Sequence, residues 1–499
     1  MPGLNSSLNI ALSGLQAQQS ALNVVGHNIA NVNTPGYTRQ RANISSGQAL
    51  IQGDVYYGSG ANVTSVQGIR DRFLNLQITQ ETAKQSGAET RYTAVNSVSS
   101  LLGDTGTTGI SAQLQAFFQS FSDLAARPED TSLRTNVLGK AQNLVTSLQT
   151  QYQMLDTQRS NADQAVGSLV GQVNTLTTQI AQLNQSITSA SSPDANNDAI
   201  DQRQALTDKL ASLVGINVVE GSKGEYQITL DSGAGVLVSG SSSYDLVAKR
   251  PGTLTDNYLQ VASDMGGTLV DVTAKIKDGQ LGANLDLRDN LLVGFQAQLD
   301  QISAGVARSV NLTHEAGFAQ NGLTTNQSFF LNASVANGAN GLPTSIAATP
   351  ALKSGSGWTD FYKGMTKLLA VNSALVADPS LIAASANGSA GDNSNALAMA
   401  QLGSANATVD TGSGTTGFTG AIGALITDLG TQTQNYSAQS TTQQHLVSAL
   451  QTQRDSISGV NLDEEASNLM MLQRGYQASA RFLSVISTLA DQLMTQLGR

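Results

Sequence analysis

The feature that most constrains this chain is a run of mainly apolar residues spaced alternately four and three apart, between Val137 and Ile187. This spacing is typical of a helix that packs along another helix through a narrow seam. At about 1.5 Å per residue, a single helix over this segment would be on the order of 75 Å long. Such a length does not fit inside a compact domain, so the pattern predicts the spine of a rod-shaped one.

Two further seams with the same spacing lie at opposite ends of the chain. They predict that the terminal helices pair in one module and that everything else is inserted between them. From spacing alone, two ordinary amphipathic helices on a globular core are an equal alternative. The large residues of the N-terminal seam are Leu4, Leu8, Leu15, Leu22, Val25 and Ile29. Those of the C-terminal seam are Leu462, Leu469, Leu472, Tyr476, Leu483, Ile486, Leu493 and Leu497.

The N-terminal helix runs into a polar turn motif. Pro35 biases Thr34 away from the helical region, and Gly36 supplies the positive φ that a type II turn needs. The asparagines of the motif are expected to cap the helix and shape the turn. They could also form hydrogen bonds to neighbouring subunits, and the two interpretations are compatible. The motif consists of Asn28, Asn31, Asn33, Thr34, Pro35, Gly36 and Tyr37.

The residues around both seams resemble those of flagellar axial proteins. Residues 27–37 are similar to the N-terminal signature of rod, hook and hook-associated proteins. The run 459–466, Gly-Val-Asn-Leu-Asp-Glu-Glu-Ala, and its continuation to 476–481 resemble hook-associated proteins of the FlgK type in particular. Further matches, such as Gly-Asp-Asn-x-Asn-Ala at 391–396, are scattered between the ends. The resemblance therefore touches most of the chain; it is most specific at the ends and looser in the middle.

This resemblance implies a structural junction protein that connects the bacterial flagellar hook to the filament. Such a protein polymerises through its terminal helices into the axial tube, as a homo-oligomeric ring, without catalysis. The implied partners are further copies of the chain, hook protein, a second hook–filament junction protein and a flagellar export chaperone that covers the C-terminal seam. The implied location is extracellular, on the flagellum, after export without a cleaved signal peptide. The main alternative is a sister axial protein of the hook or filament type.

The fold class predicted is mainly α, with an inserted β-rich module. From Ile216 the apolar period shifts towards two, which indicates strands separated by Gly and Ser turns. The expected domains are discontinuous and nested: a terminal helical core, a coiled-coil-like rod and an outer β-rich module. Their expected ranges are 1–70 with 456–499, 71–215 with 285–316 and 396–455, and 216–284 with 317–395, respectively.

Composition excludes several other classes of protein. The net charge is −10 and no strongly basic block occurs, which argues against nucleic acid as a partner. The chain has no cysteine, so disulfides and thiol nucleophiles are excluded. No apolar run reaches the roughly 18 residues that membrane insertion requires. Residues 1–30 lack the basic and apolar regions of a cleavable signal peptide.

No motif indicates a catalytic, cofactor or metal site. The histidines His27, His314 and His445 are far apart in sequence and form no HExxH motif. Residues 412–417 match GxGxxG in spelling, but they lack a clear preceding strand and a later acidic residue. A flagellum-borne enzyme would need clustered acids, which the sequence does not show. An adhesive role for residues 216–395 is a further alternative.

Overall fold

The structure, a computed structural model, forms two compact units. Unit 1 lies within residues 1–87, 166–282 and 441–499, and unit 2 lies within 88–165 and 283–440. The described residues are 2–52, 55–102, 109–190, 196–252, 257–264, 266–323, 325, 327–332, 363–404, 409–410 and 415–497.

Three long helices contribute residues to both units. Helix α4, Thr131–Thr188, is 58 residues long and contains the whole of the predicted segment. Most of its seam positions are buried; Val137, Val166 and Ile180, for example, are 0% exposed. The other two long helices are α2 (Arg72–Leu102) and α12 (Phe418–Ser458).

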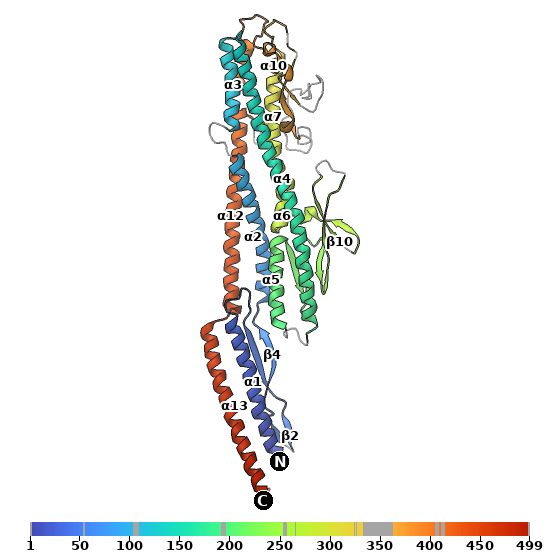
Figure 1. Cartoon of the computed structure of the whole chain (residues 1–499), viewed down its shortest axis with the longest axis vertical. Helices are drawn as coiled ribbons and strands as arrows, with labels where there is room; N and C mark the ends of the chain where they lie inside the picture. Colours follow the sequence, from blue (N-terminus) through green and yellow to red (C-terminus); the bar gives the residue numbers. More distant parts are fainter. Residues whose placement is uncertain are drawn as a thin grey trace. The chain divides into compact units, whose positions relative to one another are not determined.

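The terminal part of unit 1 pairs the two ends of the chain. Helices α1 (Pro2–Ala30) and α13 (Leu462–Leu497) lie side by side (Figure 1), which confirms the predicted pairing. The antiparallel strands β1 (Gln40–Ser46) and β4 (Ala61–Gly68) pack on α1, with a register shift at Asn43/Ile44. A short hairpin, β2 (Leu50–Gln52) and β3 (Val55–Tyr57), connects those strands.

The inserted β-rich part of unit 1 follows helix α5 (Asn197–Leu213). Its first strand begins at Ile216, where the apolar period changes in the sequence. Two antiparallel sheets have the orders β5-β6-β7-β8 and β11-β10-β9. Their strands are β5 (Ile216–Glu220), β6 (Tyr226–Leu230), β7 (Val236–Ser239), β8 (Ser242–Ser243), β9 (Leu246–Lys249), β10 (Gln260–Asp264) and β11 (Leu269–Asp271); a 3-10 turn, η2 (Thr273–Lys275), follows.

Asparagines on α4 hold these sheets through backbone groups. The Asn174 amide donates to the Leu246 carbonyl at 2.8 Å and accepts from the Leu246 N–H at 2.9 Å. The Asn184 amide makes the same kind of contact with Tyr226 and also donates to the Gly240 carbonyl. Each side chain satisfies strand groups that would otherwise need another strand.

Unit 2 has a core of aromatic rings between α3 (Ile110–Ala126), α7 (Leu292–Glu315) and the strand β12 (Phe330–Asn332). The Phe117 and Phe121 rings pack with centroids 5.3 Å apart, and the Phe329 and Phe330 rings with centroids 5.0 Å apart. All four side chains are 0% exposed.

Shorter elements complete unit 2. Helix α6, which begins in unit 1, continues through a π-helical turn, η3, into α7. Helix α11 packs on α3 and α7. These elements are α6 (Gly279–Asp286), η3 (Leu287–Leu291), α9 (Met365–Leu368), β13 (Leu369–Val371), α10 (Ser373–Ala377), η4 (Pro379–Leu381), α11 (Ser394–Gln401), β14 (Val409–Asp410) and β15 (Thr415–Thr416).

The mainly α class with inserted β-rich segments is confirmed. The β-rich residues 216–282 belong to unit 1, and the described part of 317–395 belongs to unit 2. The division into three nested domains stays a prediction.

Candidate assembly site

The two terminal helices approach closely through small residues. A Cβ added at Gly14 would lie 3.5 Å from the Ser479 hydroxyl, and one added at Gly475 would lie 3.1 Å from the Gln18 amide. These contacts show that α1 and α13 run antiparallel, since residue numbers rise along one helix as they fall along the other.

The N-terminal seam is only partly buried in this pairing. Val25 is buried, Leu15, Leu22 and Ile29 are half-buried, and Leu8 is 39% exposed. The side chain of Leu4 lies outside the described residues. The most buried apolar residues of α1 are Ala11, Ala17, Ala21 and Val25.

The C-terminal seam follows the side of α13 that is least exposed. Ile486 is only 4% exposed. The seam residues near its two ends are open, with Leu462 51% and Leu493 39% exposed. The Leu497 side chain lies outside the described residues. The half-buried members are Leu469, Leu472, Tyr476 and Leu483.

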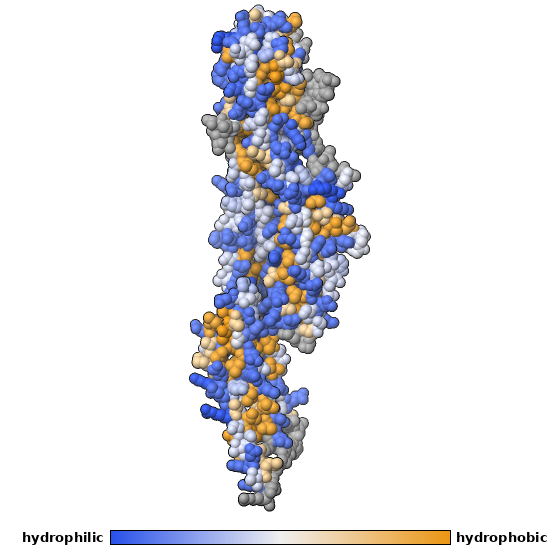
Figure 2. Space-filling view, in the orientation of Figure 1, coloured by the Kyte–Doolittle hydropathy of each residue, from blue (hydrophilic) through white to orange (hydrophobic). Residues whose placement is uncertain are grey.

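A second apolar face of α13 is exposed in the part of the chain that the structure describes. Met471, Phe482, Val485 and Leu489 are 63%, 47%, 57% and 48% exposed, and we call these four residues the outer stripe. At 100° per residue they lie roughly a quarter turn from the seam. Figure 2 shows apolar surface over these terminal helices. The sequence analysis missed the stripe, although the positions 471, 482, 485 and 489 share one helical face.

Asn28, at the end of α1, uses all four hydrogen-bonding positions of its amide. Its Nδ2 donates to the Gln40 carbonyl at 2.8 Å and to Glu465 Oε2 at 3.2 Å. Its Oδ1 accepts from the Gln40 N–H and from the Tyr37 hydroxyl, both at 2.9 Å. The residue is 1% exposed, so in this fold its amide is committed to the chain itself.

Glu465, at the start of α13, accepts the hydrogen bond from Asn28 Nδ2. Arg39 donates from Nε to Glu465 at 2.7 Å and from Nη1 to Glu464 at 2.6 Å. Glu465 is 1% exposed, and its charge is therefore compensated by a charged donor and a neutral one. Asn461 caps the helix by accepting from the Asp463 N–H. We call Asn28, Arg39 and Glu465 the terminal clasp.

The turn motif has the geometry that its Pro-Gly pair predicts. The Tyr37 N–H donates to the Thr34 carbonyl at 3.1 Å, and Gly36 has a φ of 78°. The Asn31 side chain donates to the His27 carbonyl at 3.0 Å, and the same carbonyl accepts the Asn31 backbone N–H at 3.1 Å. The residues from Asn33 to Gly36 are exposed.

Tyr37 links the clasp to His27. Its single proton goes to Asn28, so His27 Nδ1, 3.0 Å away, carries a hydrogen and donates to the Tyr37 oxygen. Burial, reinforced by the nearby carboxylates Asp198, Asp201 and Glu465, raises the pKa of Tyr37. The hydroxyl therefore stays protonated and the contact to Asn28 persists.

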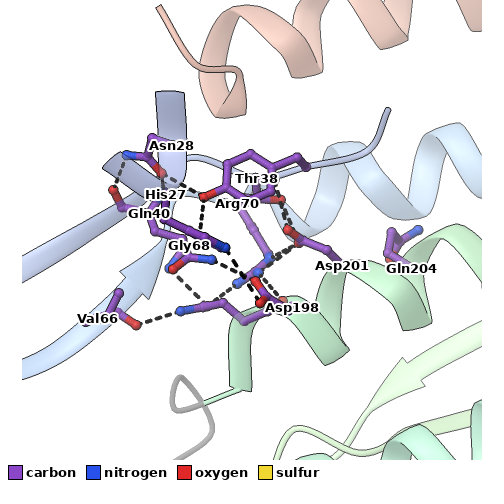
Figure 3. A network of polar contacts seen from close by, with 12 residues as sticks. His27, Asn28, Thr38, Gln40, Val66, Gly68, Arg70, Asp198, Asp201 and Gln204 are labelled. Atoms are coloured by element: carbon purple, nitrogen blue, oxygen red, sulfur yellow. Dashed lines mark hydrogen bonds and ion pairs between the residues drawn. The ribbon is translucent and has the colours of Figure 1, made fainter. Parts of the chain in front are cut away.

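A second polar network joins the turn and β4 to the start of α5 (Figure 3). Thr38 donates to Asp201 from its backbone N–H and its hydroxyl, at 2.9 and 2.8 Å. Arg70 pairs with the same carboxylate at 2.8 Å. Asn197 donates to the Val66 carbonyl at 2.7 Å. Arg39, Asn197 and Asp201 carry no periodic signal and escaped the sequence analysis.

The turn borders a polar cavity of about 710 Å³ within unit 1. Its lining includes residues 32–38 together with side chains from α2, α5, β6 and the end of α12. Inside it, the Arg203 guanidinium stacks 3.5 Å above the Tyr226 ring. The stacked pair therefore helps to position α5 and β6 beside the turn.

The described residues hold no group of three acidic or histidine side chains placed to bind a metal ion. Within the same part of the chain, no helix is long and apolar enough to cross a membrane. His314 is buried in unit 2, and His445 is exposed on α12. The GxGxxG spelling at 412–417 lies partly outside the described residues.

Known families match three parts of the chain. Residues 95–330 match the flagellar hook-associated protein FlgK helical domain. Residues 8–38 match the flagella basal body rod protein family, and residues 451–497 match the flagellar basal body rod FlgEFG protein C-terminal family. The two ends match general rod families, and the middle matches the helical domain of FlgK.

Whole proteins match over nearly the full chain. Flagellar hook-associated protein 1 of Escherichia coli (strain K12) is 30% identical, over 98% of this chain and 100% of that protein. The protein of the same name from Bacillus subtilis (strain 168) is 26% identical over 98% of each. The solved structure of the flagellar hook junction protein FlgK from Burkholderia pseudomallei has the same fold, with a TM-score of 0.63 and 19% identity over 77% of this chain and 100% of that one. The chain belongs to the flagellar hook-associated protein 1 (FlgK) family and is a structural protein of the bacterial flagellum.

Proposed function

We propose that this chain is the junction protein that connects the flagellar hook to the filament and that it polymerises through its terminal helices into the axial tube. The observation that carries the proposal is the outer stripe, an apolar face on α13 that no other described element covers. Family membership supports the junction role, because a solved relative is a hook junction protein.

The two faces of α13 have different roles in this proposal. The seam pairs with α1 inside the chain, and the outer stripe packs against the terminal helices of the next copy. Full burial of a large apolar side chain gains about 1.5–3 kcal/mol, so four such residues supply a substantial driving force for association. Exposed Leu8 and Leu12 on α1 extend the apolar surface available to a neighbour.

The remaining partners are those that the resemblance to the family implies. The assembled ring contacts hook protein on one side and a second hook–filament junction protein on the other. Before export, a chaperone covers the apolar faces of α13, since a long uncovered apolar surface invites aggregation. The folded pairing covers the middle of the C-terminal seam in part and leaves the outer stripe exposed, so the stripe is the larger apolar surface that a chaperone reaches in the folded chain. After export the protein acts outside the cell.

The experiment is electron microscopy of cells that lack this chain and are complemented with variants. Cells without the chain are expected to make hooks that carry no filaments. Complementation with the double variant Phe482→Asp/Val485→Asp should leave hooks bare while the exported protein is recovered from the medium. The matched control is Ser484→Asp, which adds a charge on a different, exposed face of the same helix and should restore filaments.

Three results would contradict the proposal. Filaments of normal length on cells that lack the chain would exclude the junction role. Missing or truncated hooks would instead favour a sister axial protein of the hook type, in line with the general rod families that match the two ends. If cells with the double variant make normal filaments, the outer stripe is not needed for assembly.

A further inference from the structure

Four side chains in unit 1 bring an alcohol, a carboxylate, a primary amide and a phenol together, and the assembly role uses none of them. They are Thr79 on α2, Gln204 and Asp208 on α5, and Tyr226 on β6. Thr79 is 2% exposed, and its hydroxyl lies 2.7 Å from Asp208 Oδ1. Gln204 Nε2 lies 2.9 Å from the same carboxylate oxygen and 3.2 Å from the Thr79 oxygen.

Thr79 and Asp208 are placed as a nucleophile and its base. The hydroxyl also lies 2.9 Å from the Asn75 carbonyl, but that carbonyl is the acceptor for the Thr79 backbone N–H within α2, so the hydroxyl proton goes to the carboxylate. An alcohol becomes nucleophilic when a positioned base takes its proton. Burial raises the pKa of Asp208 to about 6, so at neutral pH the group is mostly ionised and still basic enough to accept a proton.

The Gln204 amide is the electrophile beside this pair. Its Oε1 accepts from the Tyr226 hydroxyl at 3.0 Å, which stabilises the negative charge that develops on this oxygen when the amide carbon is attacked. Burial raises the pKa of Tyr226, so its hydroxyl keeps the proton that it donates. The 3.2 Å contact places Thr79 at the nitrogen edge of the amide. Rotation about the last side-chain bond of Gln204, a torsion with a broad minimum, turns the amide carbon towards the hydroxyl oxygen.

We propose that Thr79 and Gln204 form an intramolecular ester bond, which joins α2 to α5 covalently. The Thr79 oxygen attacks Cδ of Gln204, and its proton passes to Asp208. The Cδ–Nε2 bond then breaks, and Asp208 returns the proton to the leaving nitrogen, which it contacts at 2.9 Å. One hydroxyl and one primary amide give one ester and one ammonia, so the step needs no other reactant.

The surroundings allow the product to leave and make the bond consequential. Gln204 and Asp208 both line the polar cavity, which gives ammonia a way out. Thr79 and Gln204 are 125 positions apart, so the bond closes a long loop that includes α3 and α4. A covalent link of this kind stabilises a fold mainly by restricting the unfolded chain. In a chain that has no cysteine, it takes the place that a disulfide has elsewhere.

The test is mass spectrometry of the purified full chain after incubation at neutral pH. The wild type is expected to be lighter than its sequence by one ammonia, about 17 Da. Trypsin should then give a product that joins residues 73–84 to residues 204–209, and hydroxylamine, which cleaves esters, should separate the two peptides. A mass equal to that of the sequence would overturn the proposal. A carboxyl group in place of the amide at position 204 would also overturn it, because water would then have taken the place of Thr79.

Variants identify the groups that react. Thr79→Val removes the nucleophile at nearly constant volume and should retain the ammonia, whereas Thr79→Ser should form the bond. Asp208→Asn should slow the reaction about 100-fold, and it carries the test if circular dichroism shows that Thr79→Val does not fold. Thr82→Val, the same change one turn further along α2, is the matched control and should behave like the wild type. Loss of ammonia that persists in Thr79→Val would come from another site and would contradict the ester. These measurements use the purified chain, so their outcome is independent of whether the chain forms the junction.

Discussion

The aromatic core of unit 2 and the terminal helix pair of unit 1 are stabilised in opposite ways. In unit 2, Phe117, Phe121, Phe329 and Phe330 are completely buried among one another. In the terminal pair, α13 buries one apolar side and leaves the outer stripe open. The first region is closed around its own side chains, whereas the second retains an apolar surface after the chain has folded.

The terminal pair depends on the terminal clasp for its register. A single buried stripe between two helices gives little net stability, because helices without further packing are marginal in water. A satisfied buried amide and a charge-assisted pair then fix the register of α1 on α13. The aromatic core has a buried amide as well, since Asn311 donates to the Phe330 carbonyl and accepts from the Phe330 N–H, both at 2.8 Å, but its rings also fix the positions of its helices.

The largest effect is expected from opening the closed core. Phe117→Ala removes a ring that contacts Phe118, Phe121, Phe329 and Phe330 and should lower the stability of unit 2 by about 3–5 kcal/mol. Hydrogen exchange of amides in α3 and α7 measures this loss. Leu312→Ala, at a residue 57% exposed on α7, should stay within about 0.5 kcal/mol. Similar losses for both variants would show that the core is not close-packed.

The second effect comes from breaking the clasp. Asn28→Asp replaces the Nδ2 donor by a carboxylate oxygen, which then faces Glu465 and the Gln40 carbonyl. The lost hydrogen bonds and the repulsion should cost the terminal pair about 2–3 kcal/mol. Faster exchange of amides in α1 and α13, with α7 unchanged, is the expected observation. Asn33→Asp makes the same chemical change at an exposed position and should have little effect.

The third prediction concerns the loss of stability of unit 2 in acid, which a buried histidine causes. His314 Nε2 accepts from the Ala383 N–H at 3.2 Å, and burial lowers the pKa of His314 to about 4. Because the folded pKa is below that of the unfolded chain, stability is lost as the pH falls below about 6.5. The folding equilibrium constant of unit 2 should drop about tenfold from pH 7.5 to 5.5.

Urea unfolding at several pH values measures this loss. His314→Gln should reduce it, and His445→Gln, at an exposed histidine, should not change it. If the stability of His314→Gln falls with acid as steeply as that of the wild type, another group is responsible for the acid sensitivity.

Sequence periodicity predicted the helices but not their contacts. The spacing located α4 and the terminal seams because one face of a long helix must be apolar to be buried. The 4-3 spacing places Ala11 on the seam, but it overlooked Ala17 and Ala21, which are among the most buried residues of α1 because small side chains allow a close approach. The face predicted from the large residues is therefore displaced from the face of α1 that is buried in the structure.

The polar site was beyond prediction for a different reason. Arg39 and Glu465 are 426 positions apart, and nothing local to either residue indicates the other. Asn28 could be assigned to a helix end, but its four partners come from the turn, a strand and the opposite terminus. Such networks depend on how distant segments of the chain come together in the fold, and no local pattern in the sequence indicates this.

The smallest effect is expected from neighbouring residues on the two faces of α13. Ile486 and Val485 are adjacent in sequence but 4% and 57% exposed. Ile486→Ala should destabilise the terminal pair by about 1–2 kcal/mol, below the range of closed cores, because two helices can readjust around the gap. Val485→Ala removes a side chain already in water and should change stability by less than about 0.5 kcal/mol. Exchange of α13 amides at low protein concentration measures both.

Equal losses from the two variants would mean that the outer stripe is packed in the free chain. If those losses shrink on dilution, the packing comes from association of copies, and the contrast between a closed core and an open terminal pair would hold only for the isolated chain.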